Sequence, residues 1–242
     1  MRVFVFLALL LVPTAAQAAL VSFDDIEFWV GSGANRAAVA IDWGPGTNTP
    51  PALVWGYRWD GAASGADMFQ AVVSADKRLF TKIQNYSWGT AIYGIGYDYN
   101  ANGSFALDDG TSFGASGIAV VTASSDGSKA VEAGDLYQEG WFTGTWNYGV
   151  AAQDTAGNPT NPFAGGAWSG SSSGAAARQL SNDDWDSWAF TPGFDSGVFA
   201  SNPIAASSAV PEPGAGSLLA LGLGGMSLYR RRRTTTRLAA KT

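Results

Sequence analysis

Short stretches of β-branched, aromatic and small apolar residues recur through the middle of the chain, and glycine, proline or asparagine separates many of them. Ile26–Val30 and Ala38–Trp43 flank the turn-like segment Gly31–Asn35 and predict a β-hairpin. The 31 glycines in 242 residues argue against a helix-rich chain. The sequence therefore predicts a mainly β fold, with further strands at Ala52–Trp59, Ile92–Tyr97, Gly117–Ala123, Gly140–Val150 and Trp185–Phe190.

One segment spaces its apolar residues as a helix does. Within Asp67–Ala75 they recur at helical intervals, and Ser64 or Gly65 is placed to cap the first turn. Ala164–Ala177 is rich in glycine, serine and alanine and is typical of a loop. We expect an antiparallel β-sandwich-like domain over residues 19–199, rich in tryptophan and glycine, with one short helix.

The chain contains no histidine and no cysteine, and this excludes several classes of site. Disulfide frameworks, zinc fingers, cysteine nucleophiles, histidine-liganded metals and histidine-dependent triads all need one of these residues. Gly170–Gly174 matches the G-x-S-x-G nucleophile elbow, yet no histidine exists to act as its base. Any chemistry therefore falls to carboxylates, hydroxyls, amines and aromatic rings.

The N-terminal segment has the order of parts of a secretory signal. Arg2 precedes an apolar run that reaches Val12, and Ala16-Gln17-Ala18 supplies a small-x-small cleavage site. The run is too short to span a bilayer comfortably. We therefore predict a signal peptide at residues 1–18, which signal peptidase removes after Ala18.

The C-terminal segment carries three parts in a fixed order. Pro211, Glu212 and Pro213 come first, and the apolar stretch 214–229 follows them. As a helix this stretch is about 24 Å long, and the snorkelling of its flanking side chains extends it toward a hydrocarbon core of about 30 Å. A basic cluster predicts that the tail 234–242 stays in the cytoplasm and the preceding chain outside. The cluster consists of Arg230, Arg231, Arg232 and Arg233.

This tail, residues 210–233, resembles the PEP-CTERM sorting signal of Gram-negative bacteria, in which a Pro-Glu-Pro motif precedes a hydrophobic helix and an arginine cluster. The resemblance implies recognition by an exosortase, a membrane enzyme. It also implies a precursor held in the inner membrane by its C-terminal helix and then delivered to the cell surface or an exopolysaccharide matrix. The same tail accompanies many unrelated exported domains. Residues 200–209 are expected to form a linker to it.

The exported part of the chain is acidic. Between residues 19 and 209 there are 19 acidic and 7 basic side chains, which give a net charge of about −12. Such a field disfavours nucleic acid and anionic lipid surfaces as partners. It favours cations and neutral partners such as polysaccharide.

One loop has the spacing of a calcium site. Asp98–Asp109 fits D-x-[DN]-x-[DN]-G with an acid at the twelfth position, and Gly103 lets the chain wrap an ion. The flanking segments predict strands rather than the helices of an EF-hand. An Asn-Gly turn without metal is the alternative. The candidate calcium ligands are Asp98, Asn100, Asn102, the Ser104 carbonyl and Asp109.

Aromatic and acidic residues gather at the last predicted strand. Trp185, Asp186 and Trp188 place a carboxylate beside two rings, a combination used by sugar-binding faces and by glycosidases. The alternative is that the rings form the core, because so many tryptophans cannot all be exposed. The same question applies to Trp55, Tyr57, Trp59, Trp141, Trp146 and Trp168.

These features predict an exported, non-catalytic protein of the cell surface or the exopolysaccharide matrix. We expect it to bind polysaccharide and to hold one structural calcium ion. The rival hypothesis is a secreted glycoside hydrolase that uses paired carboxylates. Two acids about 5–10 Å apart in a deep groove would favour the hydrolase.

Overall fold

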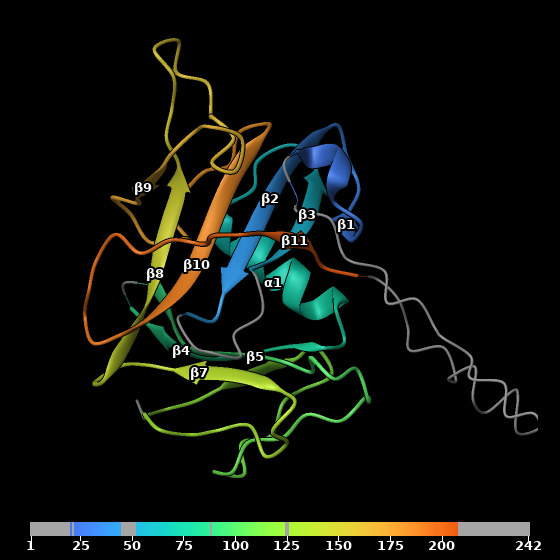
Figure 1. Cartoon of the computed structure of the whole chain (residues 1–242), viewed down its shortest axis with the longest axis vertical. Helices are drawn as coiled ribbons and strands as arrows, with labels where there is room; N and C mark the ends of the chain where they lie inside the picture. The colour runs from blue at the N-terminus through green and yellow to red at the C-terminus, as the bar shows by residue number, and fades with distance from the viewer. Residues whose placement is uncertain (1–19, 21, 45–51, 88, 124–125, 208–242) are drawn as a thin grey trace, which may run out of the picture. The chain divides into compact units, whose positions relative to one another are not determined.

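The computed structural model describes residues 20, 22–44, 52–87, 89–123 and 126–207 (Figure 1). Within these ranges the protein is mainly β, with eleven strands, one α-helix and one short 3₁₀ helix, η1 (Phe23–Asp25). No helix in the same ranges is both long and apolar enough to cross a membrane. The predicted signal peptide, sorting segment and cytoplasmic tail lie outside the described residues.

The described residues divide into two compact units. The first combines the residues up to Val72 with Phe142–Ala206, and the second comprises Val73–Trp141 together with Ser207. Each unit contains one β-sheet of its own.

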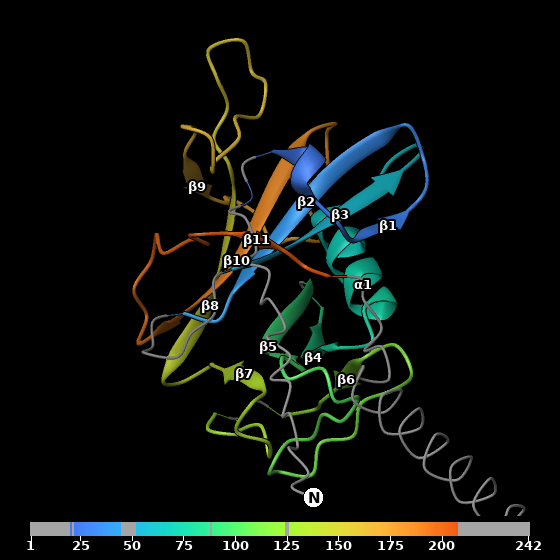
Figure 2. The same cartoon turned by 45° about the vertical axis from the view of Figure 1, so that its right-hand side comes forward.

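The first unit contains a seven-stranded sheet in the order β1-β3-β2-β10-β8-β9, with β11 paired to β3. Strands β2 and β10, which are far apart in the sequence, lie side by side (blue and orange in Figures 1 and 2). The strands are β1 (Trp29–Gly31), β2 (Asn35–Asp42), β3 (Leu53–Trp59), β8 (Gly144–Ala151), β9 (Trp168–Gly170), β10 (Asp184–Pro192) and β11 (Ile204–Ala205).

This sheet is mixed, which corrects the expected antiparallel architecture. β2 pairs antiparallel with β3 and parallel with β10, and β1 pairs parallel with β3. The predicted hairpin is therefore wrong, because β1 does not pair with β2. Gly56 explains the pairing found: an ideal Cβ there would lie 2.3 Å from a carbon of the Trp29 indole, so only glycine lets that ring lie on β3.

The predicted helix is confirmed as α1 (Gly65–Ala75). Ser64 caps it, since its Oγ accepts a hydrogen bond from the Asp67 amide at 3.2 Å and donates one to the Asp67 carboxylate at 2.7 Å. The apolar face of α1 contributes Phe69, whose ring centroid lies 5.7 Å from that of Trp188 on β10. The helix thus meets the side of β10 from which Trp188 projects.

Small residues allow close packing in the core of the first unit. Ala38 and Ala40 of β2, together with Val54 of β3, are fully buried in it. Trp185 of β10 fills the same core, with its ring centroid 4.4 Å from that of Phe23 in η1. The rest of the cluster is Leu20, Ile26, Ala52, Ala151, Ala200 and Ala205.

Part of the expected linker, 200–209, is packed instead of free. β11 extends the sheet by pairing in parallel with Leu53 and Val54 of β3. Ala200, Ala205 and Ala206 are buried. Likewise, β9 lies inside the segment expected to be a loop and pairs with β8.

The second unit contains a four-stranded sheet in the order β6-β4-β5-β7. Its neighbours are antiparallel except for β4 and β6, which are parallel. β4 and β7 were not predicted from the sequence. The strands are β4 (Leu79–Tyr86), β5 (Gly89–Tyr97), β6 (Ile118–Val120) and β7 (Leu136–Glu139).

Two glycines on the central strand β5 make room for aromatic rings above this sheet. An ideal Cβ at Gly96 would lie 2.2 Å from the Phe105 ring, and one at Gly94 would lie 2.1 Å from the Tyr137 hydroxyl. Phe105 in turn stacks on Phe80 of β4 at 4.3 Å between ring centroids. This face of β5 is therefore covered by side chains from β4, β7 and the segment that follows β5.

Candidate functional site

The predicted calcium loop follows β5 and closes on itself through its own side chains. The Asp98 carboxylate is buried and accepts hydrogen bonds from the amides of Asn102 at 3.2 Å and Gly103 at 2.8 Å. Asn100 Oδ1 accepts from the Asn102 amide at 3.0 Å, and Asn102 Oδ1 accepts from the Ser104 amide at 2.8 Å. Gly103 has a φ of +81°, which glycine adopts without strain. Asp98, Asn100 and Asn102 thus lie in one tight turn.

A second loop, absent from the sequence prediction, lies against this turn. Glu132 accepts hydrogen bonds from the side-chain amides of Asn100 at 3.1 Å and Asn102 at 2.5 Å. These bonds lower the pKa of Glu132. Gly134 permits the approach, because a Cβ there would come within 3.0 Å of the Asn100 amide nitrogen.

Asp135, on the same second loop, is the least satisfied group of this region. Its side chain is buried, and neither carboxylate oxygen accepts a hydrogen bond of ordinary geometry. Burial, followed by the charges of Asp98 and Glu132, raises its pKa to about 6, although the Tyr99 and Asn100 amides partly offset this. The charges of Asp98 and Glu132 therefore act on Asp135 where the two loops meet.

Asp109 lies apart from this group. Its carboxylate is bound to Lys82 of β4 at 2.7 Å, so the structure does not bring the twelfth-position acid to the other predicted ligands. Ser104 contributes its amide to the turn. Within the described residues, no three acids stand close enough to hold a metal ion as they are arranged.

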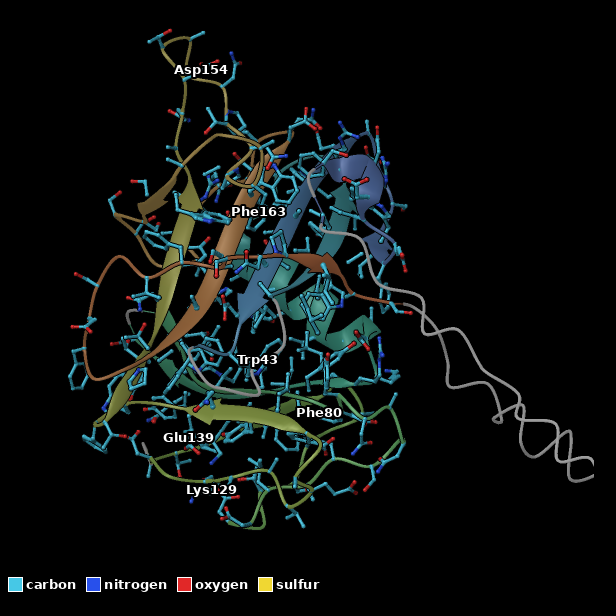
Figure 3. The ribbon with its side chains drawn as sticks, in the orientation of Figure 1. Trp43, Phe80, Lys129, Glu139, Asp154 and Phe163 are labelled. Atoms are coloured by element: carbon cyan, nitrogen blue, oxygen red, sulfur yellow. The ribbon has the colours of Figure 1, made fainter. Side chains whose placement is uncertain are left out.

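Lys82, Glu139, Tyr137 and Asp109 form a second polar cluster, in the second unit. The Lys82 ammonium contacts the Glu139 carboxylate at 3.1 and 3.2 Å as well as Asp109, and the Lys82 and Glu139 side chains are only 2% and 0% exposed. The Tyr137 hydroxyl donates to Glu139 at 3.1 Å. Glu139 lies on β7, as labelled in Figure 3.

The charges of this cluster are mutually stabilised. Burial alone would raise the pKa of Asp109, but hydrogen bonds from Lys82, Thr111 and Ser128 outweigh it and hold that pKa well below its usual range. Burial and the neighbouring Glu139 raise the pKa of Tyr137. The tyrosine therefore remains a neutral hydrogen-bond donor at physiological pH.

The predicted aromatic and acidic site on β10 is buried. Trp185 is 1% exposed, Asp186 0% and Trp188 8%, so none of them presents a platform to a polysaccharide. Trp188 stacks on Tyr148 of β8, with 4.6 Å between ring centroids. Of the other aromatic residues that could form a sugar-binding face, Trp55, Trp59 and Trp146 are buried, Tyr57 and Trp168 are half-buried, and Trp141 is exposed.

The two acids of β10 are occupied by internal partners. Asp184 forms an ion pair with Arg178 at 2.9 Å, and Asp186 accepts a hydrogen bond from the Tyr148 hydroxyl at 2.5 Å and lies 3.4 Å from Arg178. Burial raises the pKa of Asp186 to about 6, even though Arg178 and the Tyr148 hydrogen bond act against the rise. Both carboxylates are therefore buried and held by side chains of the same unit.

Residues 209–233 match the family model described as the PEP-CTERM protein-sorting motif. The match is confined to the C-terminal end, and no family model covers the central region. No curated protein and no solved structure matches the chain. The tail therefore marks an exported, membrane-transiting precursor that an exosortase sorts.

Proposed function

We propose that this chain is a non-catalytic protein of the cell surface or the exopolysaccharide matrix whose second unit binds a calcium ion. The sorting motif at 209–233 supports the destination. The net charge of about −12 between residues 19 and 209 supports a cation or a neutral polymer as partner. The buried state of Trp185, Asp186 and Trp188 argues against β10 as the place where sugar is bound or hydrolysed.

The calcium proposal rests on Asp135. A buried carboxylate that accepts no hydrogen bond of ordinary geometry is costly, and the nearby charges of Asp98 and Glu132 add to the cost. A divalent cation removes both penalties at once. The ligand set is then Asp98, Asn100 and Asn102 from the first loop, with Glu132 and Asp135 from the second.

The donor chemistry of these residues suits calcium. Carboxylate and amide oxygens are its preferred ligands, and it accepts irregular geometry that magnesium does not. Asn100 and Asn102 direct their amide nitrogens at Glu132 in the structure. In the proposed site the two amides rotate, so that their oxygens replace these nitrogens. Asp109 has no place in this set.

Thermal unfolding with and without calcium tests the site. Binding to the folded state alone stabilises it by about 2.7 kcal/mol when the ion is in hundredfold excess over Kd. Extracellular calcium modules bind with a Kd of about 10⁻⁴–10⁻³ M, so millimolar ion is required. We expect calcium to raise Tm and magnesium to have a much smaller effect.

Asp135→Asn is the decisive variant, because it keeps the shape of the side chain and removes its charge. We expect it to lose most of the calcium-dependent rise in Tm. Asp154→Asn is the matched control, since Asp154 lies in an exposed turn of the first unit and bonds only within that turn. A wild-type Tm that does not respond to about 10 mM calcium, above that Kd range, would leave the loop as an Asn-Gly turn.

A further inference from the structure

Lys82 is a buried lysine whose amine is held against a carboxyl group. Its Nζ lies 2.7 Å from Asp109 Oδ2, and the Glu139 carboxylate touches the same nitrogen at 3.1 and 3.2 Å. The side chains of Lys82 and Glu139 are 2% and 0% exposed, whereas that of Asp109 is 33% exposed. The buried Lys82 amine thus contacts two carboxylates, one of which is buried and one of which is partly exposed.

The sheet itself imposes this arrangement. Lys82 on β4 and Glu139 on β7 are both paired with Gly94 on the intervening strand β5, so the three residues form one row. Because Gly94 has no side chain, the two long side chains meet above it. The register between β4 and β5 shifts directly after Lys82, and such irregularities redirect side chains at functional sites.

We propose that Lys82 and Asp109 condense within the folded second unit to form a side-chain amide, with Glu139 as the proton carrier. The chain thereby acquires an internal covalent cross-link. This inference does not depend on calcium binding, because neither Lys82, Asp109 nor Glu139 belongs to the proposed ligand set.

The condensation balances without any co-reactant. Glu139 takes a proton from the Lys82 ammonium and passes it to Asp109, which leaves a neutral amine facing a neutral carboxylic acid. Nζ then attacks Cγ of Asp109, and the carbon–nitrogen bond forms. Glu139 moves a second proton from nitrogen to Oδ2, the Cγ–Oδ2 bond breaks, and one water molecule leaves. An ammonium and a carboxylate have become an amide and water.

The neighbours of Asp109 suit this chemistry. The Thr111 amide donates to Oδ1 at 2.8 Å, where negative charge develops in the tetrahedral intermediate. The Ser128 hydroxyl donates to Oδ2 at 2.9 Å, on the oxygen that leaves. Tyr137 holds Glu139 through its hydroxyl.

A cross-link of this kind serves an exported chain that has no cysteine. Disulfides stabilise many secreted domains by restricting the unfolded chain, and this sequence cannot form one. An amide between Lys82 and Asp109 restricts the unfolded chain in the same manner, and a reductant does not break it.

Mass spectrometry of the purified full chain tests the proposal. Trypsin cuts after free lysine and arginine, and between Arg78 and Lys129 the only such residue is Lys82. Amide formation blocks that cut. We therefore expect a peptide spanning 79–129 whose mass is one water molecule below its sequence mass. Its fragmentation should show that residues 82 and 109 are joined.

A second reaction that loses water must be distinguished. Asp109 precedes Gly110, and Asp-Gly sequences can cyclise to a succinimide with the same loss of mass. A succinimide leaves Lys82 free, so trypsin still cuts after it. A dehydrated chain that is cut at Lys82 overturns the proposal.

Three variants assign the roles, with circular dichroism as the check on folding. Lys82→Arg and Asp109→Ala should keep the full sequence mass, because each lacks one reacting group. Glu139→Gln should also keep the full mass, and cross-linking as complete as in the wild type would overturn the role of Glu139. The control Asp108→Ala changes the neighbouring acid, which bonds to the Lys129 amide, and should still lose water. A wild-type chain that is cut at Lys82 at full mass shows that the cluster is a structural ion network and overturns the cross-link.

Discussion

At the scale of single residues, Asp186 links stability to pH. Its folded-state pKa of about 6 lies above the ordinary aspartate value of about 3.9, because the carboxyl group is buried. The folded state therefore binds a proton more tightly than the unfolded state. Asp186 therefore stabilises the folded state fully below pH 4. As the pH rises through 6 this contribution is lost, and the free energy of unfolding falls by about 3 kcal/mol in total.

We predict that Asp186→Asn reduces this loss of stability between pH 4 and 7. Urea unfolding of both proteins across that range measures the difference. Asp154 should show the opposite dependence of stability on pH. Hydrogen bonds from Asn158 lower its pKa, so the stabilisation that it provides is lost as the pH falls. If the free energies of unfolding of Asp186→Asn and the wild type differ by the same amount at every pH, Asp186 does not titrate as described.

Gly94 is a second residue whose role can be measured. An alanine Cβ there would lie 2.1 Å from the Tyr137 hydroxyl and 2.6 Å from the ring carbon that bears it, so the ring must move away from Glu139. We predict that Gly94→Ala lowers the free energy of unfolding by about 1–3 kcal/mol. Gly170→Ala is the control, because its Cβ would meet no atom within 4 Å. Equal urea midpoints for the two variants would contradict the packing argument.

The sequence predicts the identity of site residues better than their partners. Asp98, Asn100 and Asn102 lie in one turn because they are close together in the sequence. Glu132 and Asp135 join them only through the path of the intervening chain, and no local pattern signals that contact. Asp109 is bound instead to Lys82 of β4, a strand that the sequence pattern does not predict.

At the scale of elements, the start of α1 is held by one serine. Ser64 and Asp67 exchange hydrogen bonds through both side chains, which satisfies amides that the helix leaves open. We predict that Ser64→Ala costs about 1 kcal/mol of stability. Gln70→Ala, at an exposed position of the same helix, should be nearly neutral. Thermal unfolding compares the two, and equal costs would show that the cap contributes nothing.

Elements were predictable where the local pattern was strong. α1 and the strands corresponding to β2, β3, β5 and β10 follow from apolar spacing. β4 buries Leu79, Thr81 and Ile83 at alternate positions, but its polar residues, among them the buried Lys82, hide this pattern in the sequence. The pairing of β1 with β3 could not be predicted, because it depends on Trp29 meeting Gly56 across the sheet.

Across the whole chain, the folded units and the sorting segment are separate parts of the sequence. Residues 209–233 carry the sorting motif, and all the described strands precede it. β11 brings the end of the described chain back to β3, so the sorting segment begins soon after a paired strand. Changes in the tail should therefore alter processing without altering the fold.

We predict that Glu212→Ala, or removal of residues 230–242, leaves the precursor exported but blocks its maturation. Glu212 lies within the matched sorting motif, and Arg230 to Arg233 end the apolar stretch on the side expected to face the cytoplasm. Lys241→Ala, beyond the motif, is the control and should mature normally. Cell fractionation with mass analysis of the mature C-terminus provides the measurement. Unchanged processing in both tail variants would mean that the motif does not act as a sorting signal here, whereas accumulation of a full-length, membrane-bound precursor would assign the processing step to these residues.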